Sequence, residues 1–454
     1  MKIPRSTAGA IKSKYEILGM RDLPFPTEAV LNPYSHDERK NGMIYAESIV
    51  RDQIDKFERL LVPKDDFPNR VRLAYVWAKG DQESGRGMGK TALLRYFRQR
   101  VNKDWGDTEF AGQFSAAVVY VSFPSQVDRR YMEQLALSAL IDITKTGVLD
   151  ASRAALRLGV MKPEQAEAVL KDDEGEDEPG NLLNNEILTK RGVDPTALDS
   201  AVTEKLMAEG VEKNAAVALA AGTFPAYLKS FRKDGALEPL YIPRDTKILD
   251  YSRQLLFNDL VNYFRAAGFG GGYLFIDDIE NLVDQMSRSE RIGFAKEFGL
   301  CTVRPGYANT AYNFFSCVLT THQQASVSLS QAWGEAGLSA IARLDPASPN
   351  SIELPLPSKD QAREIIVAHL DHYRINAAEK GSIKPFTDDG IEELLKNRQL
   401  LHPRVLLTTA SKVIAHAVDN KHSQIDAAVV SKALESTAIQ AATPDVTEGI
   451  EGAI

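Results

Sequence analysis

One short segment restricts the fold of this chain more than any other: the sequence ESGRGMGKTALLRYF, residues 83–97. Glycines alternate with other residues, a lysine and a threonine follow, and helix-forming residues come next. In such a loop successive backbone N–H groups surround an anion, and the following helix directs its positive end at a phosphate. An apolar run, RLAYVWA at 72–78, precedes the loop. The order strand, glycine loop, helix predicts an α/β fold with a phosphate site.

Each residue type in the loop suits one task in phosphate binding. The glycines let the backbone approach the anion, Lys90 reaches the outer phosphate oxygens, and the Thr91 hydroxyl ligates Mg²⁺. Ser84 stands where the strict G-x-x-x-x-G-K-[ST] pattern has its first glycine. A glycine-rich turn with an ordinary surface lysine is the alternative on the loop alone. The predicted nucleotide-binding residues are Ser84, Gly85, Gly87, Gly89, Lys90 and Thr91.

A second motif, YLFIDDIE, places two carboxylates after four apolar residues. A carboxylate at the end of a buried strand is costly unless it has a partner. In a nucleotide site that partner is the Mg²⁺ shell, so Asp277 is a predicted metal ligand together with Thr91. The next carboxylate, Asp278, would orient or deprotonate the attacking water. Because this motif follows a phosphate loop, we interpret it as the metal-binding strand of one nucleotide site.

A third strand ends in VLTTH, with Thr320 and Thr321 near its end. If this strand lies between the other two, one of these hydroxyls is placed beside the terminal phosphate, and Thr321 is the predicted site residue. A strand end capped by threonines is the alternative. Two arginines follow: Arg343 before the last strand, and Arg404 at the start of a helix after Pro403. An arginine suits a site where charge develops on a phosphoryl group, because its fork is planar and permanently charged.

The rest of the chain divides by composition. Apolar runs predict strands at 72–78, 116–124, within 268–283, 312–322 and 350–358. Because these runs lack alternation, they indicate a mostly parallel sheet covered on both faces. The expected parts are an extended arm lying on the domain that follows it (1–45), a first core part (46–127), a helical insertion with an acidic loop at 172–181 (128–260), a second core part (261–358), a helical lid (359–442) and a tail (443–454).

Composition excludes several classes of protein. The net charge of −8 argues against a chain whose whole surface attracts nucleic acid. The two cysteines, Cys301 and Cys317, lie in apolar surroundings and are expected to be small core residues rather than a disulfide framework. No apolar run approaches the ~18 residues of a membrane span, and no signal peptide is recognised. We therefore expect a cytoplasmic protein with no membrane partner.

With these motifs in this order, the chain resembles the AAA+ ATPases, and within them the initiator-type branch of origin-recognition and bacterial replication-initiator ATPases. The resemblance rests on SGRGMGKT as Walker A, YLFIDDIE as Walker B, VLTTH as sensor 1, Arg343 as arginine finger and Arg404 as sensor 2. It covers roughly residues 40 to 440 without the helical insertion. It implies a P-loop parallel sheet, a helical lid, ATP and Mg²⁺ as ligands, and a homo-oligomer in which Arg343 reaches the neighbouring subunit's nucleotide.

Two functions remain as hypotheses. The first is an ATPase that acts as an oligomeric switch or motor in a DNA-associated process such as replication, transposition or phage defence. Its partner would be DNA itself or a DNA-bound protein. The stretch YLKSFRK, 227–233, interleaves aromatic and basic residues, but an amphipathic helix explains it as well. The second is an ATP-gated scaffold that assembles partner proteins and hydrolyses ATP slowly or never, which Ser84 and the shorter carboxylate of Asp278 favour.

Overall fold

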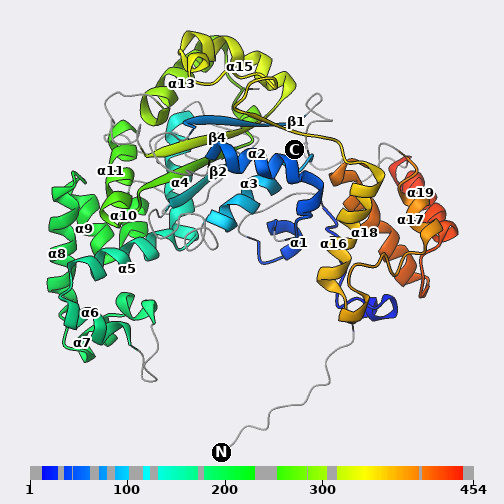
Figure 1. The fold of residues 1–454 in the computed structure, drawn as a ribbon, viewed down its shortest axis with the longest axis horizontal. Coiled ribbons are helices and arrows are strands. Elements are labelled where there is room, and N and C mark those ends of the chain that lie inside the picture. Colours follow the sequence, from blue (N-terminus) through cyan, green and yellow to red (C-terminus); the bar gives the residue numbers. More distant parts are fainter. Residues whose placement is uncertain are drawn as a thin grey trace, which may run out of the picture. The chain divides into compact units, whose positions relative to one another are not determined.

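The computed structural model of the chain divides into two compact units, shown as a ribbon in Figure 1. The helical unit comprises Met1–Ile54, Gly87–Ala92 and Leu354–Ile454, and the sheet unit comprises Asp55–Arg86 and Leu93–Glu353. The residues that the structure describes are 13–28, 35–42, 44–61, 71–78, 87–101, 116–122, 131–171, 178–230, 253–283, 285–303, 314–397 and 401–442.

The sheet unit is built on five parallel strands. They are β1 (Leu73–Ala78), β2 (Ala116–Ser122), β3 (Gly271–Asp277), β4 (Phe315–His322) and β5 (Ser351–Leu354). All five lie within the runs expected from the sequence, and the expectation of a parallel sheet is confirmed. The order across the sheet is β2-β3-β4-β1-β5, so β4 lies between the strand that precedes the glycine loop and the strand that ends in Asp277.

Burial explains why these runs form strands without polar alternation. Every residue of β1, β3 and β4 is buried, because helices cover the sheet. Helices α13 (Arg288–Phe298) and α15 (Gln323–Glu335) pack against each other, and α15 also contacts β4 (Figure 1). The remaining elements around the sheet are α2 (Arg51–Leu61), α3 (Lys90–Gln99), α12 (Glu280–Val283), the π-helical turn η6 (Gly299–Val303) and the 3₁₀ turn η7 (Leu338–Ala340). Cys301 and Cys317 are buried free thiols, as expected.

The chain between β2 and β3 is helical in its described parts, as the sequence predicts. Its elements are α4 (Tyr131–Lys145), α5 (Val148–Val160), α6 (Pro163–Leu170), η5 (Pro179–Leu183), α7 (Asn185–Lys190), α8 (Pro195–Ala208), α9 (Lys213–Ala221), α10 (Phe224–Ser230) and α11 (Arg253–Ala266). Figure 1 shows α5 to α10 gathered at one side of the sheet. Most of the acidic loop, 172–177, lies outside the described residues.

One fully buried arginine holds the far end of this insertion together. The Arg157 guanidinium contacts Asp199 Oδ1 at 2.7 Å and donates to the carbonyl oxygen of Leu182 at 2.8 Å. A buried charge is tolerated only when it is paired and hydrogen-bonded. This ion pair therefore ties α5 to α8 and η5, beside the small apolar cluster of Val169, Leu182, Leu188, Val193 and Leu198.

The helical unit has its own core, formed largely by the C-terminal helices. Its elements there are α16 (Lys359–Tyr373), η8 (Ala377–Glu379), α17 (Asp388–Leu394), α18 (Pro403–Asp419) and α19 (Ala427–Ala442). From the N-terminal part come η1 (Lys14–Leu18), α1 (Glu38–Asn41) and η2 (Glu47–Val50). Helix α18 begins at Pro403, as the sequence predicts. Among the described residues, none of the helices has the length and apolar character needed to cross a bilayer.

The N-terminal arm packs on the C-terminal helices. Leu18, Met20 and Phe25 are buried in the same apolar cluster as α16 and α18. The Arg21 N–H donates to the Tyr373 carbonyl at 2.8 Å, and the Ile375 N–H donates to the Gly19 carbonyl at 3.0 Å. The sequence predicted that this arm lies on the domain that follows it in the chain. The structure corrects that prediction, because the apolar side chains of the arm complete the core of the last domain.

This packing buries a histidine and makes the helical unit sensitive to acid. His369 of α16 hydrogen-bonds through Nδ1 to the Pro24 carbonyl at 3.2 Å and packs near the Phe25 ring. Burial lowers the pKa of His369 from 6.5 to about 4, although the hydrogen bond to Pro24 acts in the opposite direction. Between these two pH values the unfolded chain binds a proton that the folded chain does not. The contribution of the neutral His369 to the free energy of unfolding is therefore fully present above about pH 6.5. It is lost as the pH falls towards 4.

We expect His369→Gln to weaken this acid sensitivity. Over the whole range from pH 6.5 to pH 4, the free energy of unfolding should fall by about 3 kcal/mol, since one pKa unit corresponds to about 1.4 kcal/mol. Urea unfolding at pH 7.5 and pH 5 would measure the difference for each protein. The matched control is His36→Gln, because His36 is exposed. An unchanged pH dependence in His369→Gln would show that another group causes any loss of stability in acid.

Candidate functional site

The carboxylate at the end of β3 is fully buried and has hydrogen-bond partners on both oxygens. Asp277 Oδ1 accepts from Thr320 Oγ1 at 2.5 Å and from the Asp278 N–H at 3.1 Å. Oδ2 accepts from the Tyr120 hydroxyl at 2.6 Å. From the sequence, a Mg²⁺ shell is the expected partner of this buried carboxylate. The protein itself supplies three donors, so burial of Asp277 alone does not require a metal.

The threonine that joins this cluster is Thr320. Its hydroxyl donates to Asp277 and accepts from the Asp278 N–H at 3.0 Å. Thr321, the predicted site residue, donates to the carbonyl of His322 at 3.3 Å. Successive side chains of a strand point to opposite faces, so only one of two neighbouring threonines can meet Asp277. Thr320, and not Thr321, is therefore the threonine in contact with Asp277, and β4 lies between β1 and β3 as expected. A role for Thr321 beside a phosphate stays a prediction.

Asp278 differs from Asp277 in conformation and in exposure. Its φ of 55° lies in the left-handed region, which aspartate tolerates better than most residues. The sharp turn leaves Asp278 partly exposed, whereas Asp277 has no exposed surface. Glu280 follows at the start of α12 and is 1% exposed. Of the three carboxylates, Asp278 therefore has the access to solvent that a base acting on water needs.

Tyr120 is the member of the cluster that the sequence analysis missed. It lies on β2, and burial together with the nearby Asp277 carboxylate raises the pKa of Tyr120 well above 10. The phenol therefore stays protonated and donates. The only signal in the sequence is one polar-tipped residue within the apolar run AAVVYVSFP. Its role depends on β2 pairing with β3, which the run itself does not reveal.

The glycine loop is described from Gly87 onward, and the predicted residues Ser84 and Gly85 lie outside the described part. Gly87 has φ of 79° and Gly89 has φ of 93°, conformations that side chains strongly disfavour. Helix α3 begins directly afterwards at Lys90, which is 5% exposed. The glycines thus serve the turn that the sequence predicted, and Lys90 and Thr91 occupy the first turn of the helix, the end that favours anions.

Arg404 lies against this loop within the helical unit. A Cβ atom built on Gly87 would be 2.6 Å from Arg404 Cβ, 2.9 Å from its Nε and 3.0 Å from His402 Cε1. Only glycine permits so close an approach. Arg404 is exposed at the start of α18 and forms no ion pair with any other described residue. The structure therefore brings together Gly87 and Arg404, which the sequence paired only through the order of motifs.

Arg343 occupies a different place, an exposed position in the segment before β5. The preceding carbonyl, that of Ala342, accepts from the Tyr75 hydroxyl at 3.0 Å, and Trp333 Nε1 donates to the same hydroxyl at 2.8 Å. Two buried aromatic residues thus fix the backbone beside an arginine whose side chain reaches solvent. Across the described residues Arg343 takes part in no ion pair. None of the described residues accounts for its charge.

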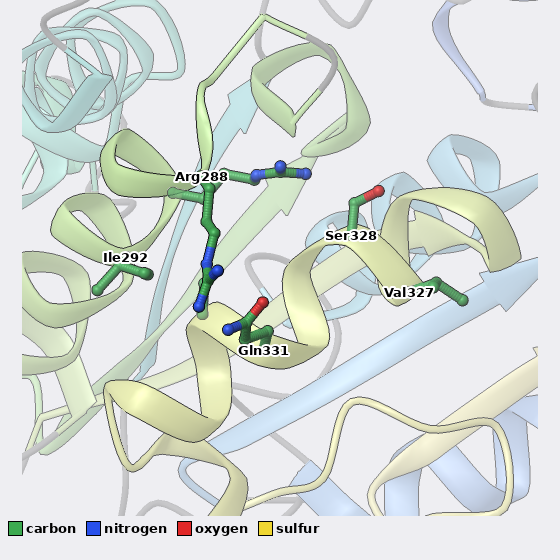
Figure 2. Close-up of a pocket in the computed structure, with 7 residues that line it drawn as sticks. Arg288, Ile292, Val327, Ser328 and Gln331 are labelled. Atoms are coloured by element: carbon green, nitrogen blue, oxygen red, sulfur yellow. The ribbon is translucent and has the colours of Figure 1, made fainter.

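A small pocket lies between α13 and α15, apart from the Asp277 cluster. Its lining includes Arg288 and Ile292 of α13 and Val327, Ser328 and Gln331 of α15, which are labelled in Figure 2. Its volume of about 200 Å³ is below the range of about 300–1,000 Å³ typical of small-molecule sites. Arg288 also contacts Glu335 at 3.4 Å. We assign no ligand to this pocket.

Comparisons with known proteins do not identify a family, because no protein-family model matches the chain and no curated protein matches it.

Proposed function

We propose that this chain is an ATP-binding ATPase of the AAA+ type that acts as a homo-oligomeric, nucleotide-driven switch or motor. The observation that carries the proposal is the strand order. Strand β1 leads into the glycine loop, β4 carries Thr320 and β3 carries Asp277, and these three strands are neighbours. In open parallel sheets ligands bind at the carboxyl ends of the strands, where these residues are found.

The oxygen atoms available as metal ligands at this site suit Mg²⁺. Carboxylate and hydroxyl oxygens are the hard ligands that this ion prefers. Both lone pairs of Asp277 Oδ1 are used by Thr320 and the Asp278 N–H, whereas Oδ2 has one described donor, Tyr120. The lone pair left on Oδ2, together with Thr91, would hold the ion. Bound Mg²⁺ would neutralise charge on the phosphates of ATP.

The other residues would act directly on the nucleotide or on water. Lys90 would bind the outer phosphate oxygens, and Thr320 would hold Asp277 and the backbone of Asp278 in place. Asp278, partly exposed, would orient the attacking water. Arg404, next to Gly87, would sense the bound nucleotide from the helical unit. Arg343 would reach the nucleotide of a neighbouring subunit, in keeping with its exposed side chain on a firmly held backbone.

The direct test is binding and hydrolysis of ATP by the purified chain with Mg²⁺, with and without double-stranded DNA. Turnover that rises with DNA would support the DNA-associated switch, for which the resemblance is the only argument. Of the basic stretch 227–233, residues 231–233 lie outside the described part. Tight binding without turnover in both conditions would favour the ATP-gated scaffold, to which the short Asp278 side chain is suited. Absence of ATP binding would contradict the proposal.

Arg343→Ala is expected to lower turnover at least 10-fold while leaving ATP affinity unchanged, because the arginine acts on charge that develops in the reaction. A mixing experiment tests whether it acts between subunits. Lys90→Met subunits carry an intact Arg343, and Arg343→Ala subunits carry an intact Lys90. A 1:1 mixture should restore activity at about a quarter of the interfaces. If the mixture stays as inactive as its components, Arg343 does not act on a neighbour.

A further inference from the structure

Tyr120 and Asp277 meet across two neighbouring strands. In the register between β2 and β3, Asp277 lies opposite Ser122, and Tyr120 is two residues before Ser122 on the same face. Diagonal neighbours of this kind are within reach of long aromatic side chains. The hydroxyl bonds to Oδ2 at 2.6 Å, while Tyr120 is 2% exposed. The 2.6 Å separation is within the short range typical of hydroxyl groups that donate to a carboxylate.

The ring of Tyr120 is itself held from helix α3. The guanidinium carbons of Arg95 and Arg98 lie 5.6 and 5.7 Å from the ring centroid, within the range of cation–π attraction. Arg98 also pairs with Asp142 of α4 at 2.9 Å, and the other oxygen of Asp142 accepts the Tyr120 N–H at 2.9 Å. Ring and backbone of Tyr120 are thus fixed together. The helix that fixes them is the one that begins at Lys90.

The oxygen that Tyr120 contacts is the one that matters for a metal. Oδ1 of Asp277 already accepts two hydrogen bonds from described residues. Oδ2 accepts only one, from Tyr120, so one of its lone pairs is left for a metal. Without the phenol, Oδ2 would lose its fixed donor, and the carboxylate as a whole would be less restrained against rotation about the Cβ–Cγ bond. Partners that orient a metal-ligating carboxylate commonly change metal affinity 10- to 100-fold when they are removed.

We propose that Tyr120 is a positioning residue for Asp277: its hydroxyl, held in place by Arg95 and Arg98 of α3, orients the carboxylate for Mg²⁺ bound with a nucleotide. The inference rests on the proposed function. It assigns to β2 a part in the site that none of the motifs in the sequence supplies. The group acts through Asp277, the carboxylate to which its buried hydroxyl donates.

The test is the Mg²⁺ dependence of nucleotide binding, measured with a fluorescent ADP analogue, in Tyr120→Phe. We expect the Mg²⁺ concentration for half-maximal binding to rise about 10-fold, with binding in EDTA unchanged. Phenylalanine keeps the ring and its contacts with the arginines. The matched control is Tyr273→Phe on β3, which removes an equally buried hydroxyl bonded to the Leu61 carbonyl at 2.6 Å. This control should lose stability without any change in Mg²⁺ requirement.

A double variant tests whether the effect of Tyr120 runs through Asp277. Adding Tyr120→Phe to Asp277→Asn should produce no further change in Mg²⁺ requirement, because residues that act through one group are not additive. The inference would be overturned if the wild type, Tyr120→Phe and Tyr273→Phe all bind nucleotide with the same Mg²⁺ requirement. The proposed function would remain intact in that case. A wild-type chain that binds no nucleotide would overturn both.

Discussion

Lys90→Met is expected to lower ATP turnover at least about 100-fold, the cost of losing one essential electrostatic contact at a reacting centre. Lys90 is the first residue of α3, where backbone N–H groups and the helix dipole favour anions, and it is 5% exposed. Methionine keeps most of the volume of the buried stem and removes only the charge. The loss should therefore appear in nucleotide binding and in turnover.

Lys380→Ala provides the control for Lys90→Met. Lys380 belongs to the same unit, is exposed and lies far along the chain from the glycine loop. Binding can be followed by fluorescence of an ATP analogue and turnover by phosphate release. Equal activity of Lys90→Met and wild type would mean that the loop is a glycine-rich turn with an ordinary lysine. That outcome would remove the basis for the proposed ATPase.

Gly87→Ala is expected to cause the second large effect, a loss of both stability and ATP affinity. The residue has φ of 79°, and a left-handed conformation costs about 1–2 kcal/mol once a Cβ is present. The new Cβ would also lie 2.6 Å from Arg404 Cβ, an atom fixed by the backbone of α18. Overpacking of this kind costs about 1–3 kcal/mol more. Arg404 should be displaced from the loop as a consequence.

Gly89→Ala separates these two costs. Gly89 has φ of 93°, and a Cβ there would meet no described atom within 4 Å. It should therefore show only the backbone cost, whereas Gly87→Ala should show the cost of the contact as well. Urea unfolding measures the stabilities of both variants. Equal losses would mean that Arg404 moves away from the loop without cost and does not form a lasting contact with it.

The central strands of this protein could be predicted because β1, β3 and β4 are short apolar runs that are buried along their whole length. Their order could not, since β1 and β4 are separated by most of the sheet unit and pair through contacts that no local pattern reports. The same limit explains why the sequence did not show which threonine contacts Asp277. Neighbouring residues Thr320 and Thr321 have equal chemistry, and only the pleat of β4 decides which of them faces Asp277.

Long-range packing also decided the two features that the sequence did not reveal. The N-terminal arm lacks periodicity, yet Leu18, Met20 and Phe25 fill the core of the C-terminal helices. Tyr120 resembles any aromatic residue of a strand until β2 is placed beside β3. In both cases the partners are far apart in the chain, so the favourable energy comes from contacts that exist only after folding.

Local spacing and backbone chemistry specify the strands, the helical insertion, the helix that begins at Pro403 and the glycine loop, so these features could be predicted from the sequence. It also supplied the candidate residues Lys90, Asp277, Asp278, Arg343 and Arg404. The contacts of these residues became visible in the folded structure, where Thr320 and Tyr120 donate to Asp277 and Arg404 lies against Gly87. A hydrogen bond or a close backbone approach needs its atoms placed to within a fraction of an ångström. That placement depends on strand order and register. Neither is recorded in local sequence.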